Sequence, residues 1–355
     1  MKKNKLLALL LLGGLTFTGC GKEGENQVQD QNIEAKQDEN KNVAQAASLE
    51  EEPRYGTPIK IGFDGDLCIA GQNLAEINGY FEEAGVDVEF INTKSGKDAL
   101  SSGQLDAMTG EFGGLLVPAT KGLKYVFSTA SHSGCKSLYV LKDSEYKNTS
   151  DLLNKSVAVT NGIGNSGHNT LLRFLIHDDL NPEDVDIKPV DSAAVIQSLE
   201  SGEIQGAVLD DQFAQEFLQR DLIRPIRSLT SDEDFGSEVC CVTAFNKDFV
   251  DNNPMLAELV AEAIEKGNQY AAENPEEAVK VLQEKNLAEG DPDVAADLLR
   301  AYDYTLTNKD GEETLRAYFD DYKELKLIPD KKSTDELMEE YWRPLGNGEV
   351  DVVSK

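Results

Sequence analysis

From residue 58 onward, short runs of β-branched and aromatic residues alternate with longer stretches whose apolar residues recur at helical spacing. Residues 59–63 predict a first strand, residues 73–84 an amphipathic helix, and residues 86–91 a second strand. Strands that alternate with helices are typical of sheets with parallel strands covered by helices. The pattern therefore predicts an α/β fold.

A second series of the same kind begins near Leu138, and its last strand, predicted over residues 237–245, would return the chain to the first sheet. After Asn246 the pattern is helical as far as Trp342. A chain that visits one sheet, crosses to another and returns predicts two lobes that close on a ligand about two hinge strands. We expect lobe 1 at residues 57–139 and 238–347, lobe 2 at 140–237, a tail at 348–355, and hinge strands at 138–142 and 237–245.

The N-terminal residues 1–19 have the pattern of an export signal. Three lysines among the first five residues precede an apolar stretch over residues 6–17, which is shorter than the ~20 residues that a membrane-spanning helix needs. The Phe-Thr-Gly-Cys sequence that ends at Cys20 resembles the lipobox of bacterial lipoproteins, although Phe17 stands where Leu is usual. We expect cleavage before Cys20 and lipidation of Cys20. The alternative is an ordinary signal peptide with an incidental cysteine.

The stretch that follows Cys20 is rich in Glu, Gln, Asn, Lys and Ala and has almost no large apolar residues. Such a segment buries too little surface to offset the entropy of ordering, so we expect a disordered tether over residues 20–56. The formal charge of −31 becomes −34 when the three lysines of residues 1–19 are removed. This charge argues against nucleic acid and anionic lipid surfaces as partners, and leaves the lipid anchor as the expected membrane contact.

Four short segments resemble the repeated elements of the substrate-binding proteins of ABC importers. They are residues 103–107 (Gly-Gln-Leu-Asp-Ala), 151–159, 201–207 and 274–278 (Asn-Pro-Glu-Glu-Ala). Within this family, the chain is most similar to the nitrate, taurine, sulfonate and thiamine-precursor receptors, and the resemblance spans residues 58–342. It implies a two-lobed periplasmic-binding-protein fold of type II with a helical C-terminal segment.

The same resemblance implies a function and a location. The protein would be a monomeric binding protein without enzymatic activity, anchored at the outer face of the bacterial cytoplasmic membrane. It would capture a small solute in the cleft and deliver it to the importer's permease. A sensory or metal-delivery lipoprotein is an alternative of another class.

Ligands of open α/β sheets bind beyond the carboxyl ends of the strands, where loops and helix N-termini converge. Five predicted loops meet this criterion, at residues 64–71, 109–113, 130–136, 161–168 and 210–212. With the returning strand, they supply the candidate ligand-binding residues Asp64, Cys68, Glu111, Phe112, His132, Cys135, Asn165, Ser166, His168, Asp211 and Cys241.

The glycine-rich loop at residues 161–168 leads from a predicted strand into a predicted helix. Free backbone amides at a helix N-terminus bind negative or polar ligand atoms, which suits Asn165 and Ser166 for this role. The alternative is a helix cap formed by one of these two residues. The loop lacks the lysine and the glycine spacing of nucleotide-binding motifs.

Thiols and imidazoles gather on the predicted site loops. Thiolate and imidazole bind soft and borderline metals, so Cys68, His132, Cys135, His168 and Cys241 are candidate metal ligands. Apart from such a metal or metal complex, we expect no cofactor. Strand alternation predicts that only one of the adjacent Cys240 and Cys241 faces the cleft.

Three other interpretations of these cysteines remain. They are buried as small apolar residues, Cys68 and Cys135 form a disulfide, or Cys135 is an enzyme nucleophile activated by His132 or His168.

Acidic residues outnumber basic ones on the site loops, where Lys136 is the sole base. An oxyanion ligand would require positive charge or many donors, so a neutral, zwitterionic or cationic solute fits at least as well. Phe112 is the best candidate for stacking against an organic ligand.

Overall fold

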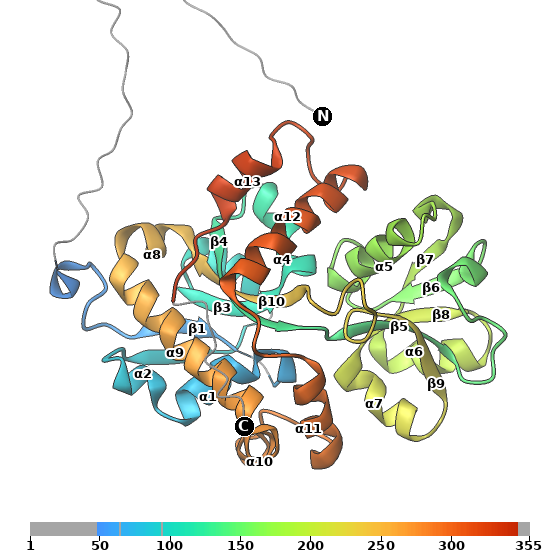
Figure 1. Cartoon of the computed structure of the whole chain (residues 1–355), viewed down its shortest axis with the longest axis horizontal. Helices are drawn as coiled ribbons and strands as arrows, with labels where there is room; N and C mark the ends of the chain where they lie inside the picture. Colours follow the sequence, from blue (N-terminus) through green and yellow to red (C-terminus); the bar gives the residue numbers. More distant parts are fainter. Residues whose placement is uncertain (1–47, 64, 94, 347–355) are drawn as a thin grey trace, which may run out of the picture. The chain divides into compact units, whose positions relative to one another are not determined.

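The structure is a computed structural model that describes residues 48–346, except residues 64 and 94 (Figure 1). All described residues fall in one unit, Val43–Lys355. The predicted signal peptide, Cys20, Asp64 and the tail at 348–355 lie outside the described residues. Within the described part of the chain, no helix combines the length and apolarity needed to cross a membrane.

Ordered structure begins earlier than the predicted tether boundary at residue 56. The carboxylate of Glu52 is 3% exposed and accepts hydrogen bonds from the first backbone amides of helix α9 (Pro254–Glu273), at Met255 and Leu256. Arg54 pairs with the buried Asp106 at 2.7 Å. The predicted end of the tether at residue 56 is therefore wrong. Glu52 caps helix α9 and Arg54 pairs with Asp106, so these charged side chains belong to the folded domain.

The first sheet has five strands in the order β2-β1-β3-β10-β4. Strand β1 pairs in parallel with β2 and β3, and β10 runs antiparallel between β3 and β4. Its strands are β1 (Ile59–Gly62), β2 (Val88–Ile91), β3 (Ala107–Glu111), β4 (Tyr125–Ser133) and β10 (Val239–Asn246). Every residue of β4 and β10 is buried, so these two strands form the centre of the first core.

The second sheet repeats this arrangement in the order β7-β6-β8-β5-β9. Strand β6 pairs in parallel with β7 and β8, and β5 runs antiparallel between β8 and β9. Its strands are β5 (Lys136–Leu141), β6 (Ser156–Val159), β7 (Asp186–Pro189), β8 (Gly206–Asp210) and β9 (Ile223–Ser228). Two mixed sheets with helices confirm the predicted α/β class and the two-sheet fold.

The chain passes between the sheets at two crossings, residues 134–135 and residues 229–238. The strands expected as hinges, at 138–142 and 237–245, instead belong to single sheets as β5 and β10. The first crossing is a tight turn, because Gly134 and Cys135 both have left-handed backbone conformations, with φ of 84° and 85°. Residues other than glycine rarely adopt this backbone conformation. The turn therefore fixes the position of Cys135 and of its thiol.

Helices cover both sheets (Figure 1). Those whose chain segments belong with the first sheet are α1 (Ala70–Ile77), α2 (Tyr80–Glu83), α3 (Gly96–Ser102), α4 (Phe112–Thr120), α8 (Lys247–Asn252), α9, α10 (Pro275–Glu284), α11 (Pro292–Ala301), α12 (Asn308–Glu324) and α13 (Thr334–Tyr341). The second sheet has α5 (Ser166–His177), α6 (Ser192–Glu200) and α7 (Asp211–Gln219). Short 3-10 turns lie at η1 (Leu49–Glu51), η2 (Leu67–Ile69), η3 (Thr149–Leu152) and η4 (Pro182–Asp184).

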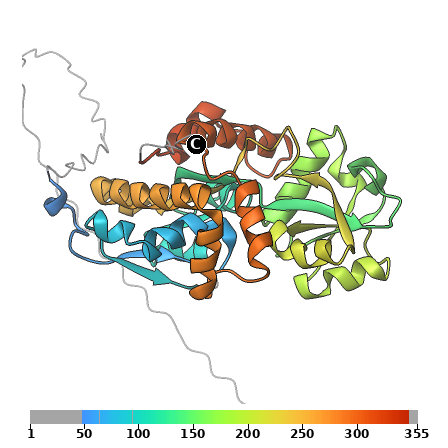
Figure 2. The same ribbon diagram turned by 60° about the horizontal axis from the view of Figure 1, so that its bottom comes forward.

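Helices α1 and α9 lie side by side (Figure 2). They approach closely because Gly71 and Gly267 face each other. A Cβ atom on Gly267 would lie 1.9 Å from the carbonyl oxygen of Gly71, a distance that no side chain tolerates. The contact fixes α9 against α1. It thereby positions η2, which immediately precedes α1.

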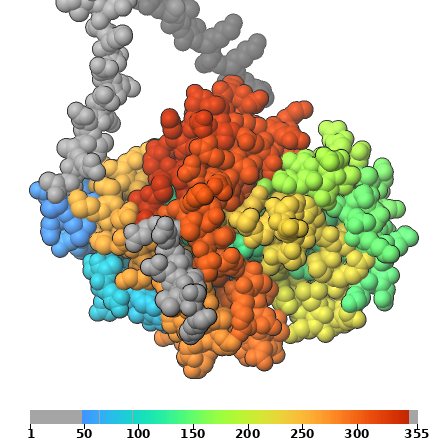
Figure 3. Space-filling view, viewed as in Figure 1, coloured from blue at the N-terminus to red at the C-terminus, as the bar shows by residue number. Residues whose placement is uncertain are grey.

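The C-terminal helices α12 and α13 pack against the outer strand β4. Capping boxes at Thr307–Asp310 and Ser333–Glu336 start these two helices. Trp342, at the end of α13, pairs with Phe127 of β4 and is 8% exposed. In the space-filling view, the red C-terminal segment abuts the green segment that contains α5 (Figure 3).

Candidate functional site at the crossings between the sheets

A buried lysine joins the two sheets. Lys136, the first residue of β5, is 2% exposed and lies 2.9 Å from the carboxylate of Glu111 at the end of β3. It also forms an ion pair with Asp210 at the end of β8. One ammonium therefore bridges a carboxylate from each sheet.

The electrostatics of this triad follow from burial and pairing. Burial lowers the pKa of Lys136, but the charges of Glu111 and Cys135 together more than offset this, so the pKa lies above its ordinary value. Burial raises the pKa of Glu111, and the charge of Lys136 offsets part of the rise. The ammonium is charged at neutral pH.

Four cysteines converge beside Lys136, and we call them the cysteine cluster. They are Cys68 on η2, Cys135 at the first crossing, and Cys240 and Cys241 on β10, and all four are buried and free of disulfide bonds. The ligand atoms of Cys135, Cys240 and Cys241 lie within 4.8 Å of one another, and so do those of Cys68, His132 and Cys241. The Cys68–Cys135 disulfide considered from the sequence is absent from the structure.

An irregular strand explains why both adjacent thiols join the cluster. The pairing of β10 with β4 shifts register on either side of Cys241, between Val239 and Cys241 and between Cys241 and Val242. Such a bulge disturbs the alternation of side chains along a strand. The prediction that only one of Cys240 and Cys241 faces the site is therefore wrong.

The four thiols do not ionise alike. Burial raises the pKa of Cys135, but hydrogen bonds from Cys240, Cys241 and Cys68 hold it well below its ordinary value, and the charge of Lys136 acts in the same sense. The pKa of Cys68 lies well above its ordinary value, chiefly through its hydrogen bond to Cys135. Burial raises the pKa values of Cys240 and Cys241.

His132 lies within β4 and not on a loop, because β4 continues to Ser133. Its Nδ1 lies 2.7 Å from the carbonyl oxygen of Ser133, and its Nε2 lies 3.0 Å from that of Cys68. Its ring stacks on Tyr302 at 5.2 Å and also contacts Tyr304. A neutral imidazole donates through one nitrogen, so whichever nitrogen of His132 carries the proton donates to the carbonyl of Ser133 or of Cys68. The ring thus lies between β4 and η2, beside the cluster.

His168 lies apart from the thiols. It is partly buried on α5, and its Nδ1 lies 3.1 Å from the side-chain oxygen of Asn169. Neither set of grouped ligand atoms includes His168. The prediction that it belongs with the cysteines is therefore not met, because α5 approaches the first sheet through α4 and not through η2.

Asn165 and Ser166 begin helix α5, as the glycine-rich loop predicted. Asn165 is the N-cap residue but makes no capping bond; its side chain instead accepts from the ammonium of Lys97 at 3.0 Å. Asn169 donates to the carbonyl oxygen of Gly113 at 2.8 Å. The start of α5 is thus held against α3 and α4 of the first sheet. These contacts leave the role of Asn165 and Ser166 in ligand binding as a prediction.

Phe112 is a core residue and not a stacking surface. It is 0% exposed and packs edge-on against Phe127, with ring centroids 5.3 Å apart. It also contacts Tyr318 of α12. The expected cleft position is wrong because Phe112 begins α4, whose apolar face turns into the first core.

Asp211 is buried at the start of α7 with its oxygens already occupied. It accepts from the hydroxyl of Tyr139 at 2.7 Å and from that of Thr230. Burial raises its pKa, and these hydrogen bonds offset part of the rise. The residue ties α7 to β5 and to the second crossing.

A pocket of about 470 Å³ opens beside the triad, between α7 on one side and η2 and α11 on the other. Its polar lining consists of carboxylates and amides, and Phe213, which is 37% exposed, contributes an aromatic face. The acidic residues are Asp66, Asp210, Glu216, Glu289 and Asp291, and none of the described residues that line the pocket is basic. The sequence indicated the acidic strand ends, but the contribution of α11 depends on long-range packing.

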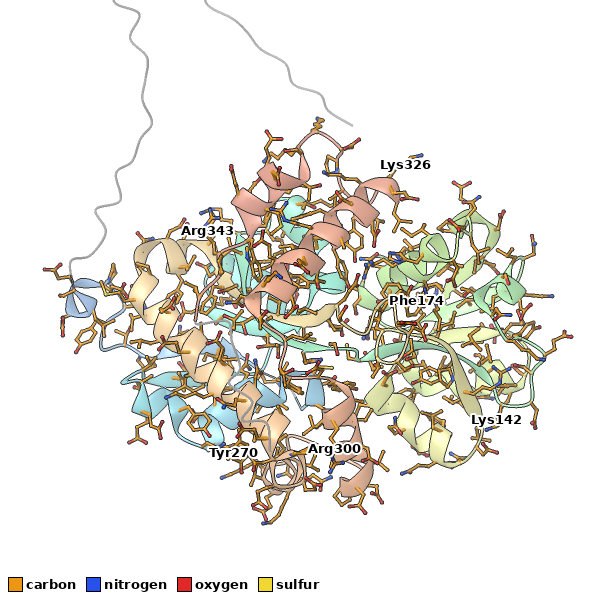
Figure 4. The ribbon with its side chains drawn as sticks, in the orientation of Figure 1. Lys142, Phe174, Tyr270, Arg300, Lys326 and Arg343 are labelled. Atoms are coloured by element: carbon orange, nitrogen blue, oxygen red, sulfur yellow. The ribbon has the colours of Figure 1, made fainter. Side chains whose placement is uncertain are left out.

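Arg173, Tyr302 and Tyr304 were missed from the sequence. Arg173 of α5 is 0% exposed and binds Glu238 of the second crossing and Asp321 of α12. Figure 4 labels its neighbour Phe174 in the interior, whereas Lys142 and Arg300 lie at the surface. The one signal in the sequence was an arginine within the helix that is predicted to follow the glycine-rich loop.

Comparisons with known proteins agree with this architecture. The family model described as NMT1/THI5 like matches residues 68–278. The alkanesulfonate-binding protein SsuA from Xanthomonas axonopodis pv. citri, solved bound to MOPS, superposes with a TM-score of 0.64 at 15% identity, over 81% of this chain and 98% of that chain. The periplasmic nitrate-binding protein NrtA from Synechocystis PCC 6803 gives 0.64 at 14%, over 81% and 86%.

A third structure of the same fold, the desulfurization enzyme DSZB, superposes with a TM-score of 0.57 at 14% identity, over 79% of this chain and 95% of that chain. These identities establish a shared fold alone. Curated protein sequences yield no significant match. Because the family model covers more than half of the sequence, from η2 through β10 to α10, the chain belongs to the NMT1/THI5-like family.

Proposed function

We propose that this chain is an extracytoplasmic solute-binding protein of an ABC importer, which captures a small molecule between its two sheets and presents it to the permease. The observation that carries the proposal is the bridge of Lys136 to Glu111 and Asp210. These residues stand at the edges where the strands of both sheets meet. A ligand that replaced Lys136 as the partner of Glu111 and Asp210, or replaced them as partners of Lys136, would contact both sheets. Its own contacts would then connect the two sheets.

The charge of the site favours a cationic, zwitterionic or neutral hydrogen-bonding solute. Glu111 and Asp210 already pair with the ammonium of Lys136, and the adjoining pocket is lined by the further acidic residues Asp66, Glu216, Glu289 and Asp291. A free nitrate or simple sulfonate would meet unbalanced negative charge. Phe213 offers its ring to a cationic or flat organic group.

Binding without chemistry fits the residues better than catalysis does. The fold is shared with an enzyme, so fold alone does not decide. A cysteine nucleophile requires an imidazole within hydrogen-bond reach and access to substrate. Cys135 is 0% exposed, and the imidazole nitrogens of His132 face carbonyl oxygens.

Lipidation at Cys20, anchoring outside the cytoplasmic membrane, and a monomeric state belong to the same proposal. The lipobox-like sequence before Cys20 supports the anchor. We expect metabolic labelling with a fatty-acid analogue to mark the wild-type chain and not a Cys20→Ser variant. Labelling that persists in the variant would contradict the anchor.

The ligand class can be tested with a panel of small solutes that differ in charge. The thermal unfolding midpoint of the full chain should rise with at least one cationic, zwitterionic or neutral solute. Asp291→Asn and Phe213→Ala should reduce this shift, whereas Arg300→Gln, on the outer surface of α11, should leave it unchanged. Stabilisation by inorganic and sulfonate anions alone would overturn the charge argument.

A further inference from the structure

The cysteine cluster has the composition of a metal site. We propose that Cys68, Cys135, Cys240 and Cys241 bind one thiophilic metal ion, of the class of Zn²⁺ or Cu⁺, where the chain crosses between the sheets. Thiolates select such ions over Mg²⁺ and Ca²⁺, which prefer oxygen. The proposal goes beyond solute capture and does not depend on it.

The spacing of the sulfurs fits a single ion. In a tetrahedral zinc site with bonds of ~2.3 Å, neighbouring sulfurs lie roughly 3.8 Å apart. The sulfurs of Cys135, Cys240 and Cys241 lie within 4.8 Å of one another before any ion draws them together. Cys68, the remaining thiol of the cluster, lies within the same distance of Cys241 and is the candidate for the fourth position.

The histidine in the second grouped set is a support and not a ligand. Both ring nitrogens of His132 face carbonyl oxygens, and Nε2 lies 3.0 Å from the carbonyl oxygen of Cys68. Moving the ring to a metal would break both contacts and the stacking on Tyr302. The imidazole instead fixes the backbone that carries the Cys68 thiol.

Two features of the backbone bring together thiols from separate parts of the sequence. The register shifts of β10 bring Cys240 and Cys241 to one place, against the usual alternation. The left-handed conformation of Cys135, with φ of 85°, directs its thiol inward at the first crossing. Burial of the cysteines as small apolar side chains would require neither of these two backbone features.

The surroundings suit a negatively charged metal–thiolate centre. Lys136 interacts with the charges of Cys135 and Cys240 and would offset part of the excess negative charge of four thiolates. The hydroxyl of Tyr302 is fully buried and has no hydrogen-bond partner among the described residues. Burial raises the pKa of this hydroxyl and the charges of Cys68 and Cys135 add to the rise, so a charged metal–thiolate centre would act on it electrostatically.

A bound ion would join η2, the first crossing and the start of β10. These three segments otherwise meet through hydrogen bonds and van der Waals contacts. Since the metal binds the folded arrangement, it would stabilise the protein by an amount that grows with the logarithm of the free metal concentration above the dissociation constant. Occupancy would therefore tie the conformation of the crossings to the supply of metal.

The test uses reduced, metal-free full-length protein under anaerobic conditions. We expect one equivalent of Co²⁺ to give the thiolate charge-transfer band and the intense visible bands of a tetrahedral site, and Zn²⁺ or Cu⁺ to displace it. Native mass spectrometry should show one ion per chain. Cys240→Ser and Cys135→Ser should each weaken binding by more than the ~10–100-fold that loss of an outer partner costs.

His168→Gln is the matched control, because His168 lies outside the cluster, and it should bind like the wild type. Tyr302→Phe should retain the tetrahedral spectrum with weakened affinity, which reports binding even if a cysteine variant fails to fold. Three results would overturn the proposal. The first is the absence of a tetrahedral cobalt spectrum in the reduced wild type. The second is equal metal binding by the wild type and by folded cysteine variants. The third is that the cysteines form disulfides and that the protein still binds no metal after these are reduced.

Discussion

The guanidinium of Arg173 donates from Nε to the carboxylate of Asp321 at 2.6 Å, and thereby fastens a helix of the second sheet to a C-terminal helix packed on the first. The same guanidinium makes two further hydrogen bonds to Glu238. It also stacks on the ring of Tyr318 at 3.9 Å. A side chain that is 0% exposed thus connects α5, the second crossing and α12.

Replacing Arg173 with methionine should lower the free energy of unfolding by about 3–5 kcal/mol, because two carboxylates lose their buried partner. Urea unfolding measures this loss. Arg300→Met is the control: its ion pairs are exposed and should contribute at most ~1 kcal/mol. Equal costs for the two substitutions would contradict the role assigned to Arg173.

The pH dependence of stability should change in an Asp321→Asn variant. Burial raises the pKa of Asp321, but hydrogen bonding to His177 and the charge of Arg173 hold it below its ordinary value of 3.8. A group whose pKa is lowered by folding stabilises the protein above the unfolded value, and this contribution is lost as the pH falls through the folded value. The difference between wild type and variant should therefore be largest at neutral pH and shrink below about pH 4. A difference that grows on acidification would refute this.

Alanine substitutions of Phe112 and Phe213 should affect different properties, the first the stability of the protein and the second its solute binding. Phe112→Ala removes a ring from the first core and should cost about 3–5 kcal/mol in unfolding free energy. Phe213→Ala, on the pocket wall, should cost about 1 kcal/mol or less and weaken solute binding instead. Chemical unfolding and calorimetric titration of both variants check the pair.

Gly267→Ala should destabilise the protein by about 1–3 kcal/mol or more, since its new methyl group would overlap the backbone of Gly71 and push α9 from α1. Gly114→Ala is the matched control within a helix. Its methyl group would meet Ser166 at an ordinary contact distance of 3.5 Å. The control should be neutral or slightly stabilising because alanine favours helices. Thermal unfolding of both variants measures the difference. Equal unfolding midpoints would show that the close approach of α9 to α1 is not required for stability.

Lys136→Met should cost about 3 kcal/mol in the wild-type background, because Glu111 and Asp210 would be left facing each other. In a Glu111→Gln, Asp210→Asn background the same substitution should cost less than half as much. A double-mutant cycle by urea unfolding measures the coupling. Equal costs in both backgrounds would show that the bridge contributes nothing.

The order of strands and helices was predictable because each strand is a short apolar run between turn residues. The end of β4 was not. Its last residues, Ser131 to Ser133, are small or polar and resemble a loop in the sequence, yet they are buried by pairing with β10 and by the packing of Tyr302. The convergence of the thiols was expected from loop positions. The grouping of both Cys240 and Cys241 depends on register shifts that no local pattern records.

The pairing of β4 has a consequence for how the protein reaches its native state. Strand β4 joins the first sheet only through β10, and β10 follows the entire second sheet in the sequence. During synthesis or refolding, residues 125–133 must wait without a ladder partner until residues 239–246 become available. Pairing between such distant segments slows folding and leaves an open strand edge exposed to other chains. Nascent or refolding chains should therefore depend on protection from aggregation until β10 inserts.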